Sequence, residues 1–200
     1  MTPRWIEPVA LEGERAVLEP LDLRHAAGLA RAAADGELWR LWYTSVPAPD
    51  RAEAYVRTAL AARDEGGAMP FAVLDRASGE VVGSTRYMNV EAAHRRLEIG
   101  STWYAKRAQR TGVNTECKLM LLRHAFETLR SIAVEFRTST FNRASQRAIE
   151  RLGAKRDGVL RNHMILPDGT YRDTVVYSIL EGEWPAVRRH LLFLLERAAP

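Results

Sequence analysis

The sequence predicts an α/β (α+β) protein built around one mixed sheet, and three observations lead to that fold class. Tight-turn signals at Ser78-Gly79 and at Pro167-Asp168-Gly169 each lie between two apolar runs, which predicts two antiparallel hairpins. Between the hairpins, an apolar run at 97–104, helical periodicity over 112–129 and a second apolar run at 132–138 predict a strand-helix-strand crossover. Such a crossover joins parallel strands and is right-handed. A parallel pair between antiparallel hairpins makes the sheet mixed.

The elements before the first hairpin follow from alternation and from capping signals. Residues 15–21 alternate between apolar and polar side chains, which predicts a short strand. Asp22 is suited to cap a helix that runs to about Asp35. Pro49 lies just before a second helix over about 50–65, which a pair of glycines ends.

The remaining elements follow in chain order. Apolar runs and alternation predict the strands, 3.6-residue periodicity predicts the helices, and Gly153 ends the helix before it. The expected strands are 71–74, 81–90, 97–104, 132–138, 159–166 and 174–180. The expected helices are 112–129, 142–152 and 184–197.

The composition excludes several classes of protein. The chain has 200 residues, of which 46% are hydrophobic and 27% charged, as in one soluble globular domain. It has no uncharged apolar run of about 18 residues, so we expect no membrane-spanning helix, and its first residues lack the apolar run of a secretory signal. Cys117 is the only cysteine, so we expect no internal disulfide, no metal site and a cytoplasmic location.

The net charge of +4 does not by itself indicate a nucleic-acid partner. The basic residues are spread along the chain with acidic residues among them, and no recognition-helix, zinc-finger or RNA-binding motif is present. We therefore expect no nucleic-acid partner.

The segment that points to chemistry is the loop before the helix at 112–129. It reads Gln109-Arg110-Thr111-Gly112-Val113-Asn114-Thr115-Glu116. A glycine at a helix start lets the backbone approach an anion, and the free N–H groups of the first turn suit a pyrophosphate. The alternative is a plain helix start capped by Thr111, Asn114 or Thr115. The loop is neither a Walker loop nor a Gly-x-Gly-x-x-Gly dinucleotide fingerprint.

The pattern Gln109-x-x-Gly112-x-Asn114 after an apolar strand resembles the acetyl-CoA signature Gln/Arg-x-x-Gly-x-Gly/Ala of the GNAT N-acetyltransferases. Leu97-Glu98-Ile99-Gly100 before the loop and Asn142-x-x-Ser145 after it resemble the Rim-type branch, the ribosomal-protein N-terminal acetyltransferases. Further matches are Arg151-Leu152-Gly153-Ala154 and the final hairpin. The resemblance covers about residues 11–190.

The resemblance implies a GNAT-like, mostly antiparallel sheet with a central splayed pair of parallel strands and helices on both faces. It implies a single acetyltransferase domain over 1–200, with a core at about 11–182 and a C-terminal helix at about 184–197. It also implies acetyl-CoA as cofactor and transfer of an acetyl group to a primary amine, either a small molecule or a protein N-terminus. The alternative is a non-catalytic CoA-binding or regulatory module.

The sequence departs from the family pattern in three places. Asn114 stands where glycine or alanine is usual. The stretch from Glu98 to Gln109 is about one residue longer than common, which a β-bulge would absorb. Ile149 stands where many GNAT enzymes have a tyrosine that acts as general acid.

The resemblance also implies roles for individual residues. Glu98 is the candidate general base, acting through water, and Ser145 is the candidate acid toward the leaving thiolate. The alternatives are a strand carboxylate paired with Arg95 or Arg96, and an ordinary serine in a first helical turn. The expected cofactor-binding residues are Thr102, Trp103, Tyr104, Gln109, Arg110, Thr111, Gly112, Val113, Asn114, Thr115 and Asn142.

Three further features leave alternatives open. His94 and His163 are weaker candidates for the base, because lone histidines are commonly structural. The cluster of Trp39, Trp42 and Tyr43 forms either a wall of the acceptor site or part of the core. The amphipathic closing helix covers the sheet edge or mediates a homodimer.

Overall fold

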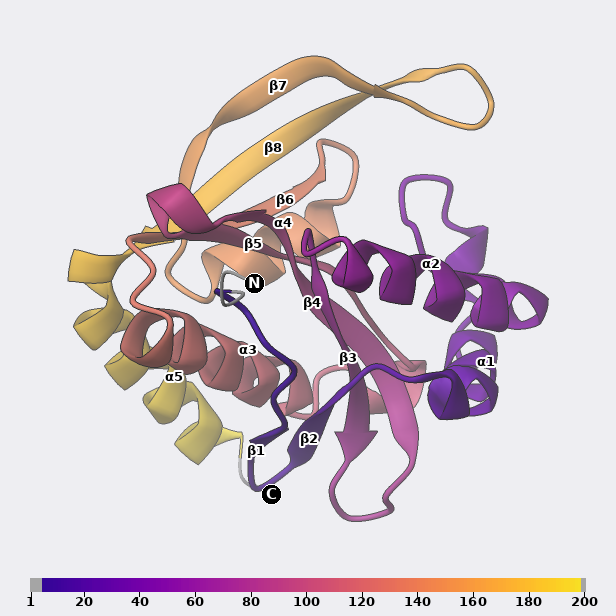
Figure 1. Cartoon of the computed structure of the whole chain (residues 1–200), viewed down its shortest axis with the longest axis horizontal. Helices are drawn as coiled ribbons and strands as arrows, with labels where there is room; N and C mark the ends of the chain where they lie inside the picture. The colour runs from indigo at the N-terminus through magenta and orange to yellow at the C-terminus, as the bar shows by residue number, and fades with distance from the viewer. Residues whose placement is uncertain (1–4, 199–200) are drawn as a thin grey trace.

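The computed structural model describes residues 5–198 and has an eight-stranded sheet in the order β1-β2-β3-β4-β5-β6-β8-β7 (Figure 1). Neighbouring strands are antiparallel except for β5 and β6, which are parallel. The predicted mixed, mostly antiparallel sheet with one parallel pair is therefore confirmed. The parts of the expected domain at 1–4 and 199–200 lie outside the described residues.

The strands have the following bounds: β1 Leu11–Glu12, β2 Ala16–Pro20, β3 Met69–Asp75, β4 Val81–Glu91, β5 Arg96–Tyr104, β6 Ala133–Ser139, β7 Lys155–Ile165 and β8 Tyr171–Leu180. The α-helices are α1 Ala26–Ala34, α2 Ala52–Asp64, α3 Val113–Arg123, α4 Arg143–Glu150 and α5 Trp184–Arg197.

The helices cover the sheet on both sides. On one side, α3, α4 and α5 pack on a core that contains Leu97, Ile99 and Phe136 from β5 and β6. On the other side, α1 and α2 pack on β3 and β4 around a second cluster that includes Leu29 and Trp103. The β7–β8 hairpin extends away from the helices (Figure 1). No helix within residues 5–198 is long and apolar enough to cross a membrane.

The two parallel strands pair over only a short length. Their register joins Arg96 to Ala133, Leu97 to Val134 and Glu98 to Glu135, and no further pairs follow. Beyond Glu98 the two strands separate, although β5 continues to Tyr104 and β6 to Ser139. This separation is the splay that the family resemblance leads us to expect, and it positions the site described below.

A bulge in β5 lies where the two strands separate. On the β4 side, Ser84 is opposite Trp103 and Arg86 is opposite Gly100, so β5 carries one residue more than β4 across this step. Ser101 takes up the irregularity with a φ of 47°. The extra residue between Glu98 and Gln109 is therefore absorbed by a bulge, as the spacing predicts.

Candidate active site

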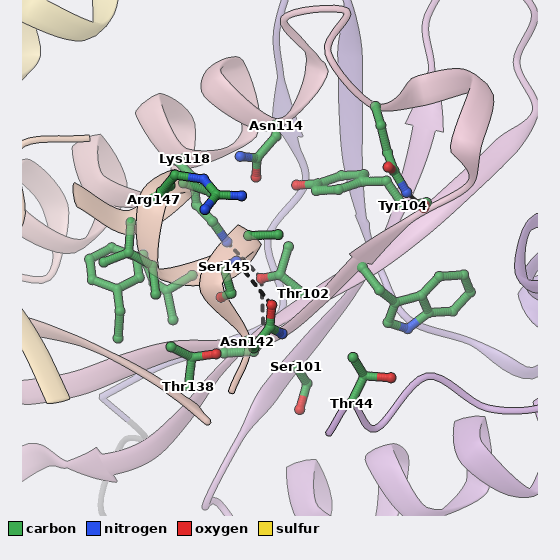
Figure 2. Close-up of a pocket in the computed structure, with 18 of the residues that line it drawn as sticks. Thr44, Ser101, Thr102, Tyr104, Asn114, Lys118, Thr138, Asn142, Ser145 and Arg147 are labelled. Carbon is green, nitrogen blue, oxygen red and sulfur yellow. Dashed lines mark hydrogen bonds between the residues drawn. The ribbon is translucent and has the colours of Figure 1, made fainter. Parts of the chain in front are cut away.

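A cavity of about 710 Å³ opens where β5 and β6 part. Its walls come from β5 and β6, from the loop that leads into α3, from α4 and from the segment 38–46 (Figure 2). Segments far apart in the chain thus meet at one opening in the sheet. Of the expected site residues, the cavity is lined by Thr102, Trp103, Tyr104, Gln109, Arg110, Gly112, Asn114, Thr115, Asn142 and Ser145.

One end of the cavity is formed by the start of α3. Gly112 is the N-cap with a φ of 89°, a conformation that glycine adopts without strain, and no side chain caps the helix there. The plain capped start is therefore not what the structure shows. The first intrahelical bond runs from the Glu116 N–H to the Gly112 carbonyl, so the N–H groups of the preceding turn are available to a ligand.

Two hydrogen bonds shape the loop before α3. The Gln109 Nε2 donates to the Tyr104 carbonyl at 3.0 Å, and the Thr111 hydroxyl donates to the Ala108 carbonyl at 2.7 Å. Gln109 thereby ties the loop to the end of β5. Thr111 and Val113 do not line the main cavity, because they face a smaller pocket beside Glu14 and Arg15.

The side chains that line the cavity are all neutral or positively charged. Within the described part of the chain, no aspartate or glutamate contributes to its wall. A cavity with this charge favours a ligand with several negative charges, such as a coenzyme that carries phosphates. The cationic residues are Arg110, Lys118, Arg137, Arg147, Arg151 and Arg172.

The start of α4 forms a second wall of the cavity. The Asn142 Oδ1 accepts the Ser145 N–H at 3.0 Å, so Asn142 is the helix cap. This cap leaves the Ser145 side chain on the cavity side of the helix (Figure 2). The Arg151 Nη2 donates to the Thr115 hydroxyl at 3.0 Å and ties α4 to α3.

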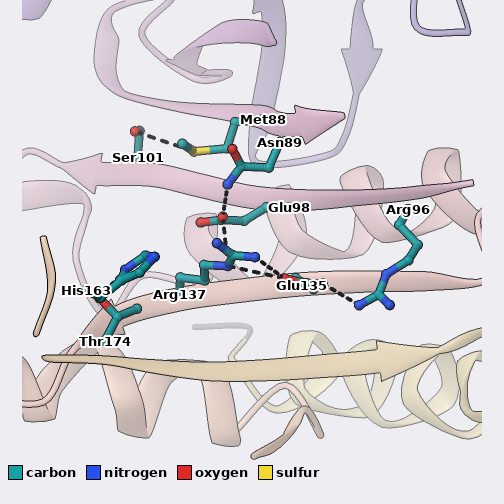
Figure 3. A network of polar contacts seen from close by, with 9 residues as sticks. All are labelled: Met88, Asn89, Arg96, Glu98, Ser101, Glu135, Arg137, His163 and Thr174. Atoms are coloured by element: carbon teal, nitrogen blue, oxygen red, sulfur yellow. Dashed lines mark hydrogen bonds and ion pairs between the residues drawn. The ribbon is translucent and has the colours of Figure 1, made fainter. Parts of the chain in front are cut away.

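Glu98 is buried on the opposite face of β5 from the core residues Leu97 and Ile99, and it lies just outside the lining of the cavity (Figure 3). Its Oε2 accepts the Asn89 Nδ2 at 2.7 Å and is 3.5 Å from the Arg137 Nε. Burial raises the pKa of Glu98, while Asn89 and Arg137 oppose that rise.

The ion-pair partner of Glu98 differs from the two that the sequence suggests. Arg96 pairs with Glu135 instead, and the partner of Glu98 is Arg137 from the neighbouring strand (Figure 3). The other oxygen of the carboxylate, Oε1, lies over Gly100, where a Cβ would be only 2.7 Å from it. Since Gly100 lines the cavity, this oxygen is next to the wall.

Lys118 is a cavity residue that the sequence analysis missed. It is 5% exposed, and its Nζ donates to the Thr102 hydroxyl at 2.6 Å and to the Thr85 hydroxyl at 3.4 Å. Burial lowers the pKa of Lys118 to about 7. One signal was available: Lys118 lies one helical turn before Leu122, on the face that the periodicity marks as apolar.

The remaining candidates lie at the edges of the site. His94 lies in a short 3₁₀ turn before β5, away from the cavity lining, and the His163 Nδ1 is 3.0 Å from the Thr174 hydroxyl. Tyr43 lines the cavity, whereas Trp42 is 56% exposed and packs on Phe141 at 5.1 Å between ring centroids. Trp42 is therefore not part of the core.

A mixed sheet opened between two parallel strands, with a cationic cavity and a glycine-capped helix at the opening, defines an acyl-CoA-dependent acyltransferase. A family model described as Acetyltransferase (GNAT) domain matches residues 15–155. The chain therefore belongs to the GNAT acetyltransferase family, and it is an N-acetyltransferase that uses acetyl-CoA.

Individual relatives agree with this assignment. A crystal structure of a candidate acetyltransferase from T. thermophilus is 40% identical, with a TM-score of 0.83 over 96% of this chain and 99% of that chain. YoaA, an uncharacterized N-acetyltransferase of Bacillus subtilis (strain 168), is 26% identical over 86% of this chain and 96% of its own length. Mycobacterium smegmatis RimJ, solved in complex with CoA-disulfide, shares the fold at 24% identity, with a TM-score of 0.79 over 97% of each chain.

Proposed function

We propose that the protein acetylates a primary amine by direct attack of the neutral amine on the thioester of acetyl-CoA, and that its acceptor is a small amine rather than a protein N-terminus. The observation that carries the proposal is the cationic cavity at the opened strands, which lies between the α3 start and the Glu98 region of β5. Bound acetyl-CoA would supply the activated acetyl group.

The cofactor would be held at its phosphate end by the N–H groups of the first turn of α3 and by Arg110. The φ of Gly112 turns the loop so that these N–H groups are open to a ligand. Arg147 and Arg151 on α4 line the same cavity and add positive charge. Asn142 fixes the start of α4 beside them.

Glu98 would accept a proton from the ammonium group of the acceptor through a water molecule, which leaves the neutral amine that attacks. A base needs a pKa near the working pH, and burial raises the pKa of Glu98 toward that range. The Oε1 over Gly100 is the oxygen next to the cavity, since Oε2 is bonded to Asn89. Main-chain N–H groups near Thr102–Tyr104 would polarise the acetyl carbonyl, and Ser145 would donate its hydroxyl to the leaving sulfur.

The preference for a small acceptor comes from the aromatic residues beside the cavity. Tyr43 forms part of its wall, and Trp42 packs on Phe141, which joins the 38–46 segment to the loop between β6 and α4. The Tyr43 ring would contact a small acceptor, and the Trp42–Phe141 contact would hold this segment beside the cavity, whereas an extended peptide needs an open groove.

A single assay tests the function. The purified protein is incubated with acetyl-CoA and with a panel of small amines and of peptides with free N-termini, and products are identified by thiol release and by the mass of the acetylated acceptor. We expect small amines to be acetylated, and Glu98→Ala and Ser145→Ala each to lower kcat by about 100-fold with little change in CoA affinity.

The control is Glu53→Ala, which removes an exposed carboxylate on α2. Acetylation of peptides alone would overturn the small-amine preference. Tight CoA binding without turnover on any acceptor would identify a non-catalytic CoA-binding module, and unchanged turnover in both site variants would discard the roles given to Glu98 and Ser145.

A further inference from the structure

We propose that Lys118 donates a proton to the sulfur of the departing coenzyme. In many GNAT enzymes a tyrosine has this role, at the position that Ile149 occupies in this chain. This inference rests on the proposed acetyl transfer. It adds a residue from the second turn of α3 to a site that also includes β5, β6 and the first turns of α3 and α4.

Lys118 reaches the opened strands from α3. Its side chain reaches from α3 to the bulge of β5, where the Nζ bonds to the Thr102 hydroxyl at 2.6 Å. Lys118 and Ser145 point into the same part of the cavity from two different helices (Figure 2). Lys118 thus lies where the two parallel strands separate.

The Lys118 ammonium is surrounded by neutral hydrogen-bond partners. Among residues 5–198, its Nζ is bonded only to the hydroxyls of Thr85 and Thr102, and no carboxylate pairs with it. A buried ammonium without an anion is costly, so the structure favours either loss of its proton or arrival of a negative charge. The leaving thiolate is such a charge, and it forms only during the reaction.

The titratable groups near Lys118 differ from it in the pH at which they ionise. Cys117 is the neighbouring residue on α3, and burial raises the pKa of its thiol to about 12, so it stays neutral. The Tyr104 hydroxyl from β5 is also neutral, because burial raises its pKa well above the ordinary value. Arg147 of α4 and Arg151 at its C-terminal end also line the cavity, and both are cationic side chains. Lys118 is therefore the group here that titrates near neutral pH.

The other candidate donors are less suited than Lys118 to protonate the sulfur. Ile149 lines the cavity and has no proton to give. The Ser145 hydroxyl is a weak acid, suited to a hydrogen bond with the sulfur rather than to net proton transfer. An ammonium with a pKa of about 7 matches the task of a general acid at neutral pH.

The proton balance of the step is simple. As the amine nitrogen bonds to the acetyl carbon and the carbon–sulfur bond breaks, the electron pair of that bond stays on sulfur. The proton on the Lys118 Nζ moves to the sulfur, which leaves a neutral lysine and a free thiol. Lys118 then takes up a proton from solvent, while the proton of the attacking amine leaves through Glu98.

The test measures the thiol of bound CoA, which requires no turnover. The complex of the protein with free CoA is titrated with base while the ultraviolet absorbance of the thiolate is followed, with the desulfo-CoA complex as baseline. In the complex the thiolate and the Lys118 ammonium stabilise each other, so the two groups titrate as a coupled pair, and we expect the thiolate to form about 1–2 pH units lower in the wild type than in Lys118→Met. Lys155→Met is the matched control, because Lys155 lies on β7 and pairs with Glu183 at the surface.

Steady-state kinetics supply the second readout. We expect Lys118→Met to lower kcat by about 100-fold and to abolish the fall of kcat at high pH, with little change in CoA affinity. Lys118→Arg retains the charge but cannot release a proton, so we expect it to keep the lowered thiol pKa and to lose turnover.

The outcomes separate this inference from the proposed function. A wild-type protein that binds no CoA contradicts the proposed function itself. A wild type that binds CoA and acetylates an amine, together with a Lys118→Met variant of unchanged thiol pKa and unchanged pH profile, overturns the role of Lys118 alone.

Discussion

Because Gly100 has no side chain, it leaves space for the carboxylate of Glu98, the candidate base. A Cβ at this position would lie 2.6 Å from the Met88 Sδ and 2.7 Å from the Glu98 Oε1, both at the ends of flexible side chains. We therefore expect Gly100→Ala to leave the fold intact while displacing the carboxylate of Glu98. Such a displacement lowers kcat by about 100-fold and leaves the Kd of CoA nearly unchanged.

The matched control for this change is Gly158→Ala, since no atom lies within 4 Å of a Cβ built there. Steady-state kinetics and CoA titration by calorimetry check both variants. Equal kcat values for Gly100→Ala and Gly158→Ala would show that the position of the Glu98 carboxylate does not limit the rate.

Lys118 reduces the stability of the folded protein when it carries its charge. Its pKa falls from 10.5 to about 7 on folding, so between these values the unfolded chain binds a proton that the folded chain does not. Stability of the wild type therefore rises with pH across this window, and below it the cost of burying the ammonium is fully present. We expect Lys118→Met to be more stable than the wild type at pH 7, because Thr85 and Thr102 still bond to each other at 2.7 Å.

Urea unfolding at a series of pH values checks this prediction. The stability advantage of Lys118→Met is largest at and below pH 7 and shrinks as the pH approaches 10.5. Parallel curves for the two proteins would contradict it. A substitution that stabilises the fold and slows turnover would show that the buried charge serves the reaction.

At the residue scale, the sequence predicts the starts of α3 and α4 well and the charges around them poorly. Gly112 and Asn142 are predicted because a glycine at a helix start and an asparagine cap are local signals. Arg137 and Lys118 were missed because their significance comes from neighbours on other elements. Glu98 is 3.5 Å from Arg137 only because the fold sets β5 beside β6.

At the element scale, one carboxylate from α3 holds the turn between β1 and β2. Glu116 accepts the N–H groups of Glu14, Arg15 and Ala16 at 2.9, 2.8 and 2.8 Å. We expect Glu116→Ala to lower the free energy of unfolding by about 2–3 kcal/mol, because these donors lose their acceptor in a partly buried position. Urea unfolding measures the change.

The control for Glu116 is Glu196→Ala, which removes an exposed carboxylate from α5. We expect that variant to differ from the wild type by less than about 0.5 kcal/mol. A loss of stability equal to that of Glu116→Ala would contradict the clamp between α3 and the turn.

The predicted bounds of a helix or strand agree best with the structure where its pattern of apolar residues is regular. The closing helix is predicted with the bounds of α5, because Pro185 and a regular apolar stripe mark it. The single helix expected at 112–129 is instead α3 followed by a π-helical turn at His124–Thr128, since a change in hydrogen bonding leaves no trace in the apolar period. β7 begins four residues earlier than expected, at Lys155, because its first residues are exposed and charged.

At the scale of the whole molecule, charge is distributed unevenly between the surface and the cavity. The net charge is only +4, yet the cavity is lined by six cationic side chains and by no acidic one within the described residues. We expect the affinity for acetyl-CoA to fall by about fivefold to tenfold between low salt and 0.5 M salt.

Calorimetric titrations at several salt concentrations test this expectation, with S-acetylpantetheine, which lacks the phosphates, as control ligand. Its weaker affinity is expected to change little with salt. An equal dependence for both ligands would indicate that the cationic wall does not act on the phosphates.

The outline of the fold could be predicted from the sequence, because turn signals identify the antiparallel hairpins and one crossover identifies the parallel pair. The contact of Trp42 with Phe141 joins residues about 100 positions apart, and no local pattern encodes it. No local pattern encodes the wall of the cavity either, because its lining residues lie far apart in the chain, between Leu38 and Ala198.

The short ladder between β5 and β6 has a consequence for the mechanics of the sheet. Within the described residues, β5 and β6 pair at three positions, and one more main-chain bond runs from the Ile132 N–H to the Arg95 carbonyl, so few main-chain bonds join the β1–β5 half of the sheet to the β6–β8 half. A coenzyme bound in the gap between β5 and β6 would contact both halves of the sheet. It would restrict their relative motion while the acetyl group and the amine are aligned for reaction.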